Sequence, residues 1–440
     1  MNRRLLSIGL LTAFGALLAP AILRAQSHPR SSMALGETPA DAGRAAARPD
    51  PPSPPRPLSG LHAVPIPEPG LRGGLDAIAL VRSGNAWAVG AYQTASSDLT
   101  LAMHFNGRRW HVVFTPNPSA GWAHFFSVAG KGANDVWAVG TYAPTNAGWP
   151  NLAFRALAEH WDGSRWRVIS TPNVGAAETL FGVAVLGPAD AWAVGGSYNS
   201  KISFQNLQCE HTAHTLIEHW NGRAWRVVPG PDPGRSASFP QPCGPSHPRT
   251  TVNVLSGIAA VRPGDLWAVG HYWDGTANRT LVEHWNGRRW SLVPSPNSSA
   301  AENVLYVPAV ASPRVVWAAG TYRPAPRAHD RTLIERWNGR VWRVVPSPNV
   351  PGQDNLLFGI AARGPDAWAV GRHDGSAGGP LAEHWDGTRW TIVPSQKVGR
   401  CACTNSLNGV AIGPLATWAA GEFIGANVHR SVIEAGRSLH

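Results

Sequence analysis

Histidine and aspartate occur close together at two equivalent places in this sequence, and the first of them also contains a tryptophan. One is "HYWDGT", which begins at His271, and the other contains His373 next to Asp374. Indole faces pack against the apolar face of a sugar ring, while carboxylates and imidazoles hydrogen-bond its hydroxyl groups. These residues therefore indicate a binding site, and their alternative role is to pack loops. The candidate ligand-binding residues are Trp122, Trp149, His271, Trp273, Asp274, His373 and Asp374.

A glutamate next to a histidine recurs along the chain and resembles an acid–base pair. An active site needs only one such constellation, so repetition favours a structural hydrogen bond instead. Aspartates two residues before a repeated tryptophan are interpreted as turn residues. The glutamate–histidine pairs are Glu159/His160, Glu218/His219, Glu283/His284 and Glu383/His384, and the aspartates are Asp135, Asp190, Asp265 and Asp366.

Four cysteines occur in irregular insertions. Cys209 and Cys243 each lie in a long insertion, and Cys401 and Cys403 stand one residue apart in a third. In an exported chain this pattern predicts a Cys209–Cys243 disulfide, with a second bridge between the other two as an option. Nearby histidines leave zinc binding as an alternative. The prediction is that the protein uses no cofactor.

The first residues have the layout of an export signal: Arg3 and Arg4, an apolar run over 5–23, and a small residue at Ala25. Residues 1–25 are predicted to be a signal peptide, with an uncleaved membrane anchor as the alternative. Residues 26–57, which include "RPDPPSPPRP", are predicted to be a disordered Pro-rich tether. These segments predict a protein that is secreted or held at the cell surface or in the periplasm.

The formal net charge of the 440-residue chain is +11 at pH 7. Most of this surplus belongs to the residues after the tether, where it permits an acidic partner without requiring one. Eight arginines follow or sit within short turns predicted to share one face, and they form either a basic ring for acidic polymers or a solvated surface. Nucleic acid is not an expected partner, because an exported chain without a stacking platform has no means to read bases. These arginines are Arg108, Arg109, Arg165, Arg223, Arg288, Arg289, Arg340 and Arg389.

The tetrapeptide "WAVG" or "WAAG" occurs seven times, at intervals of 50, 55, 75, 50, 51 and 50 residues. The first six units also carry an apolar segment such as "LFGIAA", then one like "TLIEHW", an Asn-Gly or Asp-Gly pair, and a segment like "WRVVPSPN". Short strands separated by Gly, Pro and Asp predict four antiparallel strands per unit, with a primed two-residue hairpin turn between the last two. The repeated tryptophans are Trp87, Trp137, Trp192, Trp267, Trp317, Trp368 and Trp418.

The seventh unit stops after its third strand. Residues 61–68, "LHAVPIPE", match "WRVVPSPN" at 342–349, with Leu61 in the place of Trp342 and Val64 in the place of Val345. We therefore predict that residues 58–440 form an all-β, seven-bladed β-propeller. The N-terminal strand is expected to complete the last blade and so remove two open sheet edges.

The W-A-[VA]-G and E-H-W-N-G-x-x-W pattern over residues 58–440 resembles secreted bacterial β-propeller repeat proteins, a family that is mostly uncharacterised. The period is similar to that of kelch repeats, and the Asp-Gly hairpins, such as Asp162-Gly163, are similar to the Asp-box of sialidase-type propellers. The Arg-Ile-Pro signature of sialidases is absent, so this resemblance implies a fold and no activity.

The sequence thus favours a monomeric, non-enzymatic binding or scaffold propeller outside the cytoplasm. Its expected partner is a glycan, a cell-wall polymer or a protein, and its only expected membrane link is an uncleaved N-terminal anchor. The alternative is a carbohydrate-active hydrolase or lyase that uses carboxylates outside the repeat pattern. The available acids are Glu178, Asp274, Glu302, Asp354 and Asp374.

Overall fold

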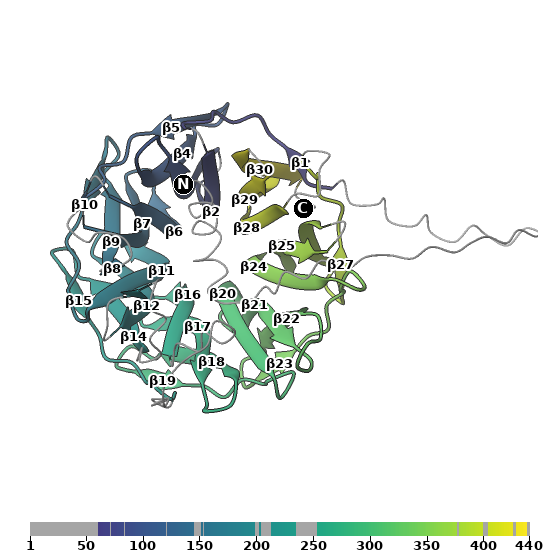
Figure 1. Ribbon diagram of the computed structural model, residues 1–440. Coiled ribbons are helices and arrows are strands. Elements are labelled where there is room, and N and C mark those ends of the chain that lie inside the picture. Colours follow the sequence, from purple (N-terminus) through teal and green to yellow (C-terminus); the bar gives the residue numbers. More distant parts are fainter. Residues whose placement is uncertain are drawn as a thin grey trace, which may run out of the picture. The chain divides into compact units, whose positions relative to one another are not determined.

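Seven four-stranded antiparallel sheets are arranged as blades around a central axis (Figure 1). This is a seven-bladed β-propeller, as predicted, and no helix occurs in the described part of the chain. The segments 1–25 and 26–57 lie outside that part. The computed structural model describes residues 60–437 apart from 71, 83, 120, 145–150, 153, 199–201, 204–212, 235–252, 376–377, 399–403 and 426–427.

The innermost strand of each blade comes from the apolar "LFGIAA"-type segment. These strands lie nearest the axis in Figure 1 and are buried on both faces by neighbouring blades, which accounts for their near-continuous apolar sequence. In order from blade one to blade seven they are β2 (Arg72–Arg82), β6 (Ala123–Gly132), β11 (Ala177–Gly187), β16 (Asn253–Arg262), β20 (Glu302–Ser312), β24 (Asp354–Arg363) and β28 (Thr404–Ile412).

The second strand of each blade carries the "WAVG" or "WAAG" sequence. Its glycine must lack a side chain, because a Cβ at Gly140 would lie 1.9 Å from the carbonyl oxygen of His124 on the adjacent strand. The second strands are β3 (Asn85–Gln93), β7 (Asp135–Tyr142), β12 (Asp190–Tyr198), β17 (Asp265–Trp273), β21 (Val315–Arg323), β25 (Asp366–Asp374) and β29 (Ala416–Ile424).

The third strands come from the "TLIEHW" segments and the short outer strands from the "WRV" segments. The third strands are β4 (Asp98–Phe105), β9 (Arg155–Trp161), β14 (Ala213–Trp220), β18 (Asn278–Trp285), β22 (Arg331–Trp337), β26 (Gly379–Trp385) and β30 (His429–Arg437). The outer strands are β5 (Trp110–Val113), β10 (Trp166–Val168), β15 (Trp225–Val227), β19 (Trp290–Leu292), β23 (Trp342–Val344), β27 (Trp390–Ile392) and β1 (His62–Ala63), and a small extra sheet pairs β8 (Asn151–Leu152) with β13 (Ile202–Ser203).

The hairpin between the third and outer strands differs from the predicted primed two-residue turn. Four residues connect the strands, and the glycine, such as Gly107, has positive φ whereas the preceding Asn106 does not. The Asn106 side chain instead accepts hydrogen bonds from the backbone N–H groups of Arg108 and Arg109, at 3.1 Å each. The asparagine thus stabilises the turn through its side chain, which removes the need for a left-handed backbone at that position.

The repeated tryptophans form the contacts between blades. Trp87 of blade one is fully buried and packs against Trp161 and Trp166 of blade two, with ring centroids 4.9 and 5.1 Å apart. The same arrangement recurs around the ring, and Trp418 of blade seven contacts Trp110 of blade one. The prediction that these indoles are core residues is confirmed.

The repeated histidines and aspartates have a structural role. His160 Nε2 donates a hydrogen bond to Asp135 at 3.0 Å, and the imidazole packs on Trp137 with centroids 4.6 Å apart. Equivalent His–Asp bonds occur in blades three, four and six. The prediction of a structural hydrogen bond is therefore confirmed, but the partner of the histidine is the turn aspartate and not the adjacent glutamate.

The repeated glutamates point into the interfaces between blades. Five of them are 0 % exposed and Glu434 is 1 % exposed, while Met103 occupies the same position in blade one. Burial raises the pKa of Glu159 and Glu283 to about 9 and that of Glu218 to about 8. For these three and Glu383, neither carboxyl oxygen has a hydrogen-bond partner among the described residues. These side chains are therefore neutral acids in an apolar environment at neutral pH.

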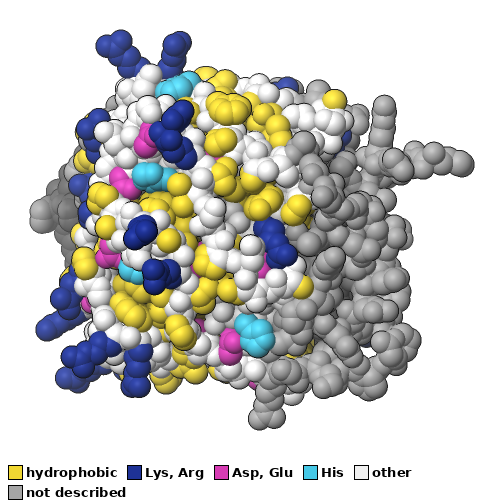
Figure 2. Space-filling view, turned by 90° about the vertical axis from the view of Figure 1, so that its left-hand side faces the viewer, with side chains coloured by type: hydrophobic (Ala, Val, Ile, Leu, Met, Phe, Trp, Pro, Cys, Tyr) yellow, Lys and Arg dark blue, Asp and Glu magenta, His cyan; other side chains and the backbone are white. Residues whose placement is uncertain are grey.

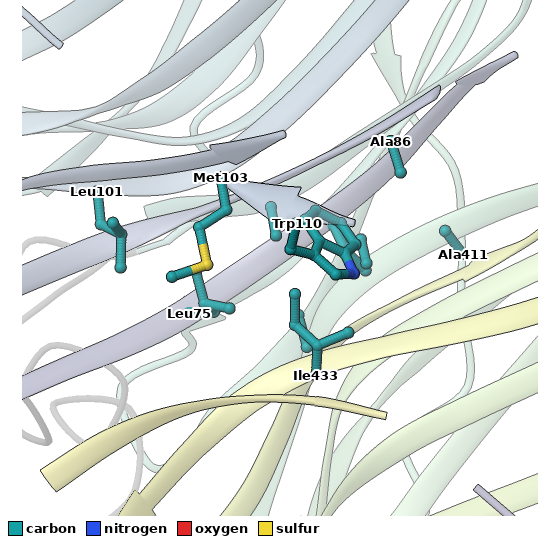
Figure 3. Close-up of a cluster of buried hydrophobic side chains, with 10 residues drawn as sticks. Leu75, Ala86, Leu101, Met103, Trp110, Ala411 and Ile433 are labelled. Carbon is teal, nitrogen blue, oxygen red and sulfur yellow. The ribbon is translucent and has the colours of Figure 1, made fainter. Parts of the chain in front are cut away.

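The N-terminal strand closes the ring as predicted. His62 and Ala63 pair with Ala435 and Glu434 of β30, and the Val64 N–H donates to Ile433 at 2.7 Å. This register places Leu61, which is 1 % exposed, where the other blades have the tryptophan that begins the outer strand. Figure 3 shows the adjoining interface, where Leu75, Met103 and Trp110 of blade one cluster with Ala411 and Ile433 of blade seven.

Candidate functional site at the inner strands

The two ends of the blades form two different faces. Turns between the first and second strands meet the hairpins between the third and outer strands: a Cβ at Gly84 would lie 3.6 Å from the Cα of Gly107. We call this end the hairpin face. The opposite end carries the connections between second and third strands and those between blades, and we call it the loop face. Loops that vary between repeats belong to the loop face, so departures from the repeat concentrate there.

The tryptophans proposed as exposed binding groups are buried. Trp122 is 9 % exposed and packs edge-on against Phe154, with ring centroids 5.4 Å apart, and Trp273 is 8 % exposed. Trp122 also packs against His124 of the same blade, with ring centroids 5.6 Å apart. These two indoles therefore have little exposed face, which fits the alternative of loop packing. Their role in binding a ligand stays a prediction without an exposed surface to support it.

The polar members of the predicted set mostly stabilise local structure. Asp274 caps its own turn by accepting the N–H groups of Thr276 and Ala277, and it pairs with Arg279 at 2.6 Å. Burial raises the pKa of Asp274, but these hydrogen bonds outweigh it and hold the pKa below the usual range. Burial lowers the pKa of His271 to about 4, so this side chain is neutral.

The corresponding residues of blade six also have local partners. His373 Nδ1 hydrogen-bonds to the side-chain oxygen of Gln353 at 2.7 Å, and burial lowers its pKa. Asp374 accepts a hydrogen bond from Arg372 Nε at 2.9 Å. The predicted residues lie on blades two, four and six, with a whole blade between each pair, so the structure does not bring them into one site. Trp149 and the cysteines Cys209, Cys243, Cys401 and Cys403 lie outside the described residues.

A different set of residues lies on the inner strands, which are the strands nearest the axis. Every inner strand contains a β-bulge at the same place, and at this bulge one residue per blade does not pair with the second strand. Bulges displace a side chain from the regular alternation and often occur beside functional sites. From blade one to blade seven the bulge residues are Asp76, Phe126, Phe181, Ser256, Tyr306, Phe358 and Asn408.

Four of these bulge residues are aromatic and form two adjacent pairs. The rings of Phe126 and Phe181 lie 5.4 Å apart, and those of Tyr306 and Phe358 lie 5.7 Å apart. The three phenylalanines are partly exposed, whereas Tyr306 is buried. Packing of the blades does not require an aromatic ring here, because Ser256 and Asn408 occupy the same position in other blades. The structural repeat therefore does not account for the aromatic side chains at these four positions.

Charged groups flank each aromatic pair. His124 stacks on Phe126 with centroids 4.6 Å apart, and its Nε2 contacts the Asp76 carboxylate at 2.6 Å. Burial raises the pKa of Asp76, although the adjacent His124 partly offsets this rise. On the other side of the ring, the Arg372 guanidinium lies 5.4 Å from the centre of the Phe358 ring. The axial surface thus offers apolar faces with hydrogen-bonding and ionic groups beside them.

The sequence contains a signal for this surface. In segments such as "LFGIAA" and "LSGIAA", the second position varies between blades while the positions around it stay apolar or small. A variable position inside an otherwise uniform inner strand marks the bulge. The direction of its side chain cannot be deduced from the alternating pattern of a regular strand, because the bulge interrupts that pattern.

Acidic side chains outside the repeat pattern form ion pairs and hydrogen bonds with neighbouring residues. Glu178 is fully buried, pairs with Arg155 at 2.9 Å and accepts the N–H groups of Val174 and Gly175. Asp354 accepts the N–H of Asp330. No group of three or more histidine, cysteine, aspartate or glutamate side chains in the described segments is arranged to hold a metal ion. In those same segments, no helix has the length and apolarity needed to span a bilayer.

Comparisons with known proteins support the fold. No protein-family model and no curated protein matches the sequence. Among solved structures, the chain is similar to YCF48 bound to a D1 peptide, with a TM-score of 0.50 and 14% identity over 88% of this chain and 99% of that one. It is also similar to a PL25 ulvan lyase bound to a sulfated polysaccharide fragment, with a TM-score of 0.50 and 11% identity over 84% and 97%. At these identities the likeness shows a shared propeller fold, which hosts both binding proteins and glycan-active enzymes.

Proposed function

We propose that this protein is a non-enzymatic binding propeller outside the cytoplasm, which holds a chain-like partner over the axial aromatic surface. That partner is a glycan, a cell-wall polymer or a protein segment. The observation that carries the proposal is the pair of aromatic clusters at the inner-strand bulges, Phe126 with Phe181 and Tyr306 with Phe358. Partly exposed rings with polar neighbours bind sugar rings or apolar side chains through their faces.

The export-type N-terminus supports a location outside the cytoplasm, and the Pro-rich segment 26–57 supports a tethered domain. The solved neighbours are consistent with either type of ligand, since one is bound to a peptide and the other to a polysaccharide fragment.

Replacing both Phe126 and Phe181 with serine is expected to weaken ligand binding about tenfold or more, because two stacking faces are lost. Serine fits the position, since Ser256 occupies it in blade four. The measurement is binding of wild type and variant to glycan and peptide arrays, followed by titration of the best ligand. Phe114→Ser is the matched control, because that side chain is 83 % exposed beyond the outer strand of blade one. A ligand that binds both proteins equally would refute the axial site.

A second candidate function, a glycan-active hydrolase or lyase, is favoured by the Asp76–His124 pair. Unlike the repeated His–Asp bonds of the hairpin face, it occurs beside the aromatic surface, and the Asp76 side chain is 27 % exposed. A carboxylate that orients an imidazole is a common arrangement for proton transfer.

If the protein is such an enzyme, the wild-type protein releases products from a neutral or acidic polysaccharide. The substitution Asp76→Asn is then expected to lower the rate of product release by about 10²–10⁴-fold. Asp190→Asn, which alters a structural His–Asp bond on the hairpin face, is expected to leave the rate within a few-fold. Product release is followed by reducing-end and unsaturated-uronate assays. Equal rates in wild type and Asp76→Asn would exclude the pair from catalysis.

A further inference from the structure

The hairpin face carries a ring of exposed positive charge. Its hairpins contribute eight arginines, and its turns between first and second strands add basic residues in five blades. In Figure 2, which views the propeller edge-on, Lys and Arg side chains gather along the left-hand edge. The exposed basic residues of the hairpins are Arg108, Arg109, Arg165, Arg223, Arg288, Arg289, Arg340 and Arg389, and those of the turns are Arg82, Lys131, Arg262, Arg314 and Arg363.

Acidic groups on this face are fewer and are engaged. Four aspartates bond to the repeated histidines, as described above, and are 3–32 % exposed. Asp162 and Asp386 accept the N–H groups of their own turns. The face therefore keeps a large positive surplus, and its field extends about one Debye length, roughly 8 Å, into physiological solution.

The connections on the hairpin face are short. Two residues connect β2 with β3 and four connect β4 with β5, and the other blades have similarly short connections, apart from the incomplete hairpin of blade seven. The tryptophans that begin the outer strands are buried, for example Trp110 at 4 % and Trp166 at 3 % exposure. The tryptophans that end the third strands, such as Trp161 and Trp385, are partly buried and pack against the indoles of the preceding blade. The exposed groups of this face are therefore mainly charged, and a planar anionic surface contacts many blades at once.

The closing strand of blade seven begins at this same end. Leu61 occupies the position at which the outer strand begins in the other blades, directly after the hairpin. In blade seven the turn between first and second strands presents Leu415, 78 % exposed, in place of a basic residue. Blade seven thus adds one exposed apolar side chain to the charges of this face.

We propose that the hairpin face docks on the surface of an anionic lipid bilayer, which leaves the loop face and the axial aromatic surface directed away from the membrane. Each arginine near an anionic surface adds to the attraction, and the ring arrangement allows several to approach phosphate groups together. The attraction is electrostatic, so it weakens as salt rises.

The test is co-sedimentation of the full chain with vesicles of phosphatidylcholine containing about 30 % phosphatidylglycerol and with vesicles of phosphatidylcholine alone. The variant Arg288→Gln/Arg340→Gln/Arg389→Gln removes three hairpin charges. Its matched control, Arg327→Gln/Arg331→Gln/Arg430→Gln, removes three exposed charges at the loop end of the blades. At low salt, the hairpin variant is expected to bind anionic vesicles about a hundredfold more weakly than wild type, and the control is expected to stay within about threefold.

Three results would overturn the proposal. One is no preference of wild type for anionic over neutral vesicles, which would leave only insertion of the N-terminal apolar run. Another is equal weakening in both variants, which would reflect net charge alone. The third is displacement of the protein from vesicles by heparin when the concentration of heparin's anionic groups is lower than that of the anionic lipid. This result would identify a soluble acidic polymer as the partner.

Discussion

Deleting residues 58–69 is expected to lower the melting temperature of the propeller by about 10 °C. The deletion removes the outer strand of blade seven, including the fully buried Leu61 and the partly buried Val64 and Ile66. Loss of this apolar burial costs on the order of 5 kcal/mol, and the unpaired edge of β30 is exposed as well. The measurement is thermal unfolding followed by calorimetry and by tryptophan fluorescence.

Single substitutions separate lost burial from lost backbone pairing. Leu61→Ala is expected to destabilise the fold by about 2–5 kcal/mol, because it leaves a cavity between blades. His62→Ala is the matched control: its side chain is exposed although its backbone pairs with Ala435, so its effect should stay within about 0.5 kcal/mol. An unchanged melting temperature in the deletion variant would contradict closure by this strand.

The fold could be predicted from the sequence because its signals are local and repeated. Trp87 and its six equivalents mark one strand per blade, and "VPSPN"-type endings mark where the outer strand stops. The closing strand was recognisable because Pro65 and Pro67 repeat the spacing of Pro346 and Pro348. Pairing then fixed the register, since the Val64 N–H donates to Ile433 as Val345 donates to Ile334.

The candidate site could not be predicted in the same way. Trp273 breaks the repeat, which favours a binding role, yet its side chain is buried, since departures from a pattern also arise where loops pack on a blade. Phe126 and Phe358 give no such signal in the sequence, because they lie within apolar strands and have the residue type expected of core positions. Only the bulge, which depends on pairing between strands, shows that these rings leave the core alternation. A sequence alone states the order of residues but not the local shift that redirects a side chain.

The buried glutamates are expected to make the protein markedly less stable as pH rises from about 5 to 9. Each glutamate ionises near pH 4.5 in the unfolded chain, whereas burial raises the folded-state pKa, to about 9 for Glu159 and Glu283 and to about 7 for Glu434. Below pH 4.5 both states hold the proton, so these groups then carry no penalty. Above it the unfolded chain loses protons that the folded chain retains, and stability falls until the pH reaches the folded pKa.

Replacing Glu283 with methionine tests this directly. Methionine is compatible with the position, because Met103 occupies it in blade one and is fully buried. At pH 5 the variant is expected to match wild type within about 1 kcal/mol, since both side chains are neutral. At pH 9 the variant should be more stable by on the order of 4 kcal/mol, because wild type must either retain a proton or bury a charge. Urea unfolding at intervals of pH measures the difference.

Glu178→Gln provides the contrast between a buried glutamate with partners and one without. Glu178 is as buried as Glu283, but it pairs with Arg155 and accepts two backbone N–H groups. Its replacement removes an ion pair and should lower stability from pH 5 to 9, because the partly buried Arg155 guanidinium loses its charged partner. If Glu283→Met instead showed the same stability difference from wild type at pH 5 and pH 9, the interface carboxyl would have to be ionised or solvated. The neutral acids between the blades would then not account for any pH dependence of the fold.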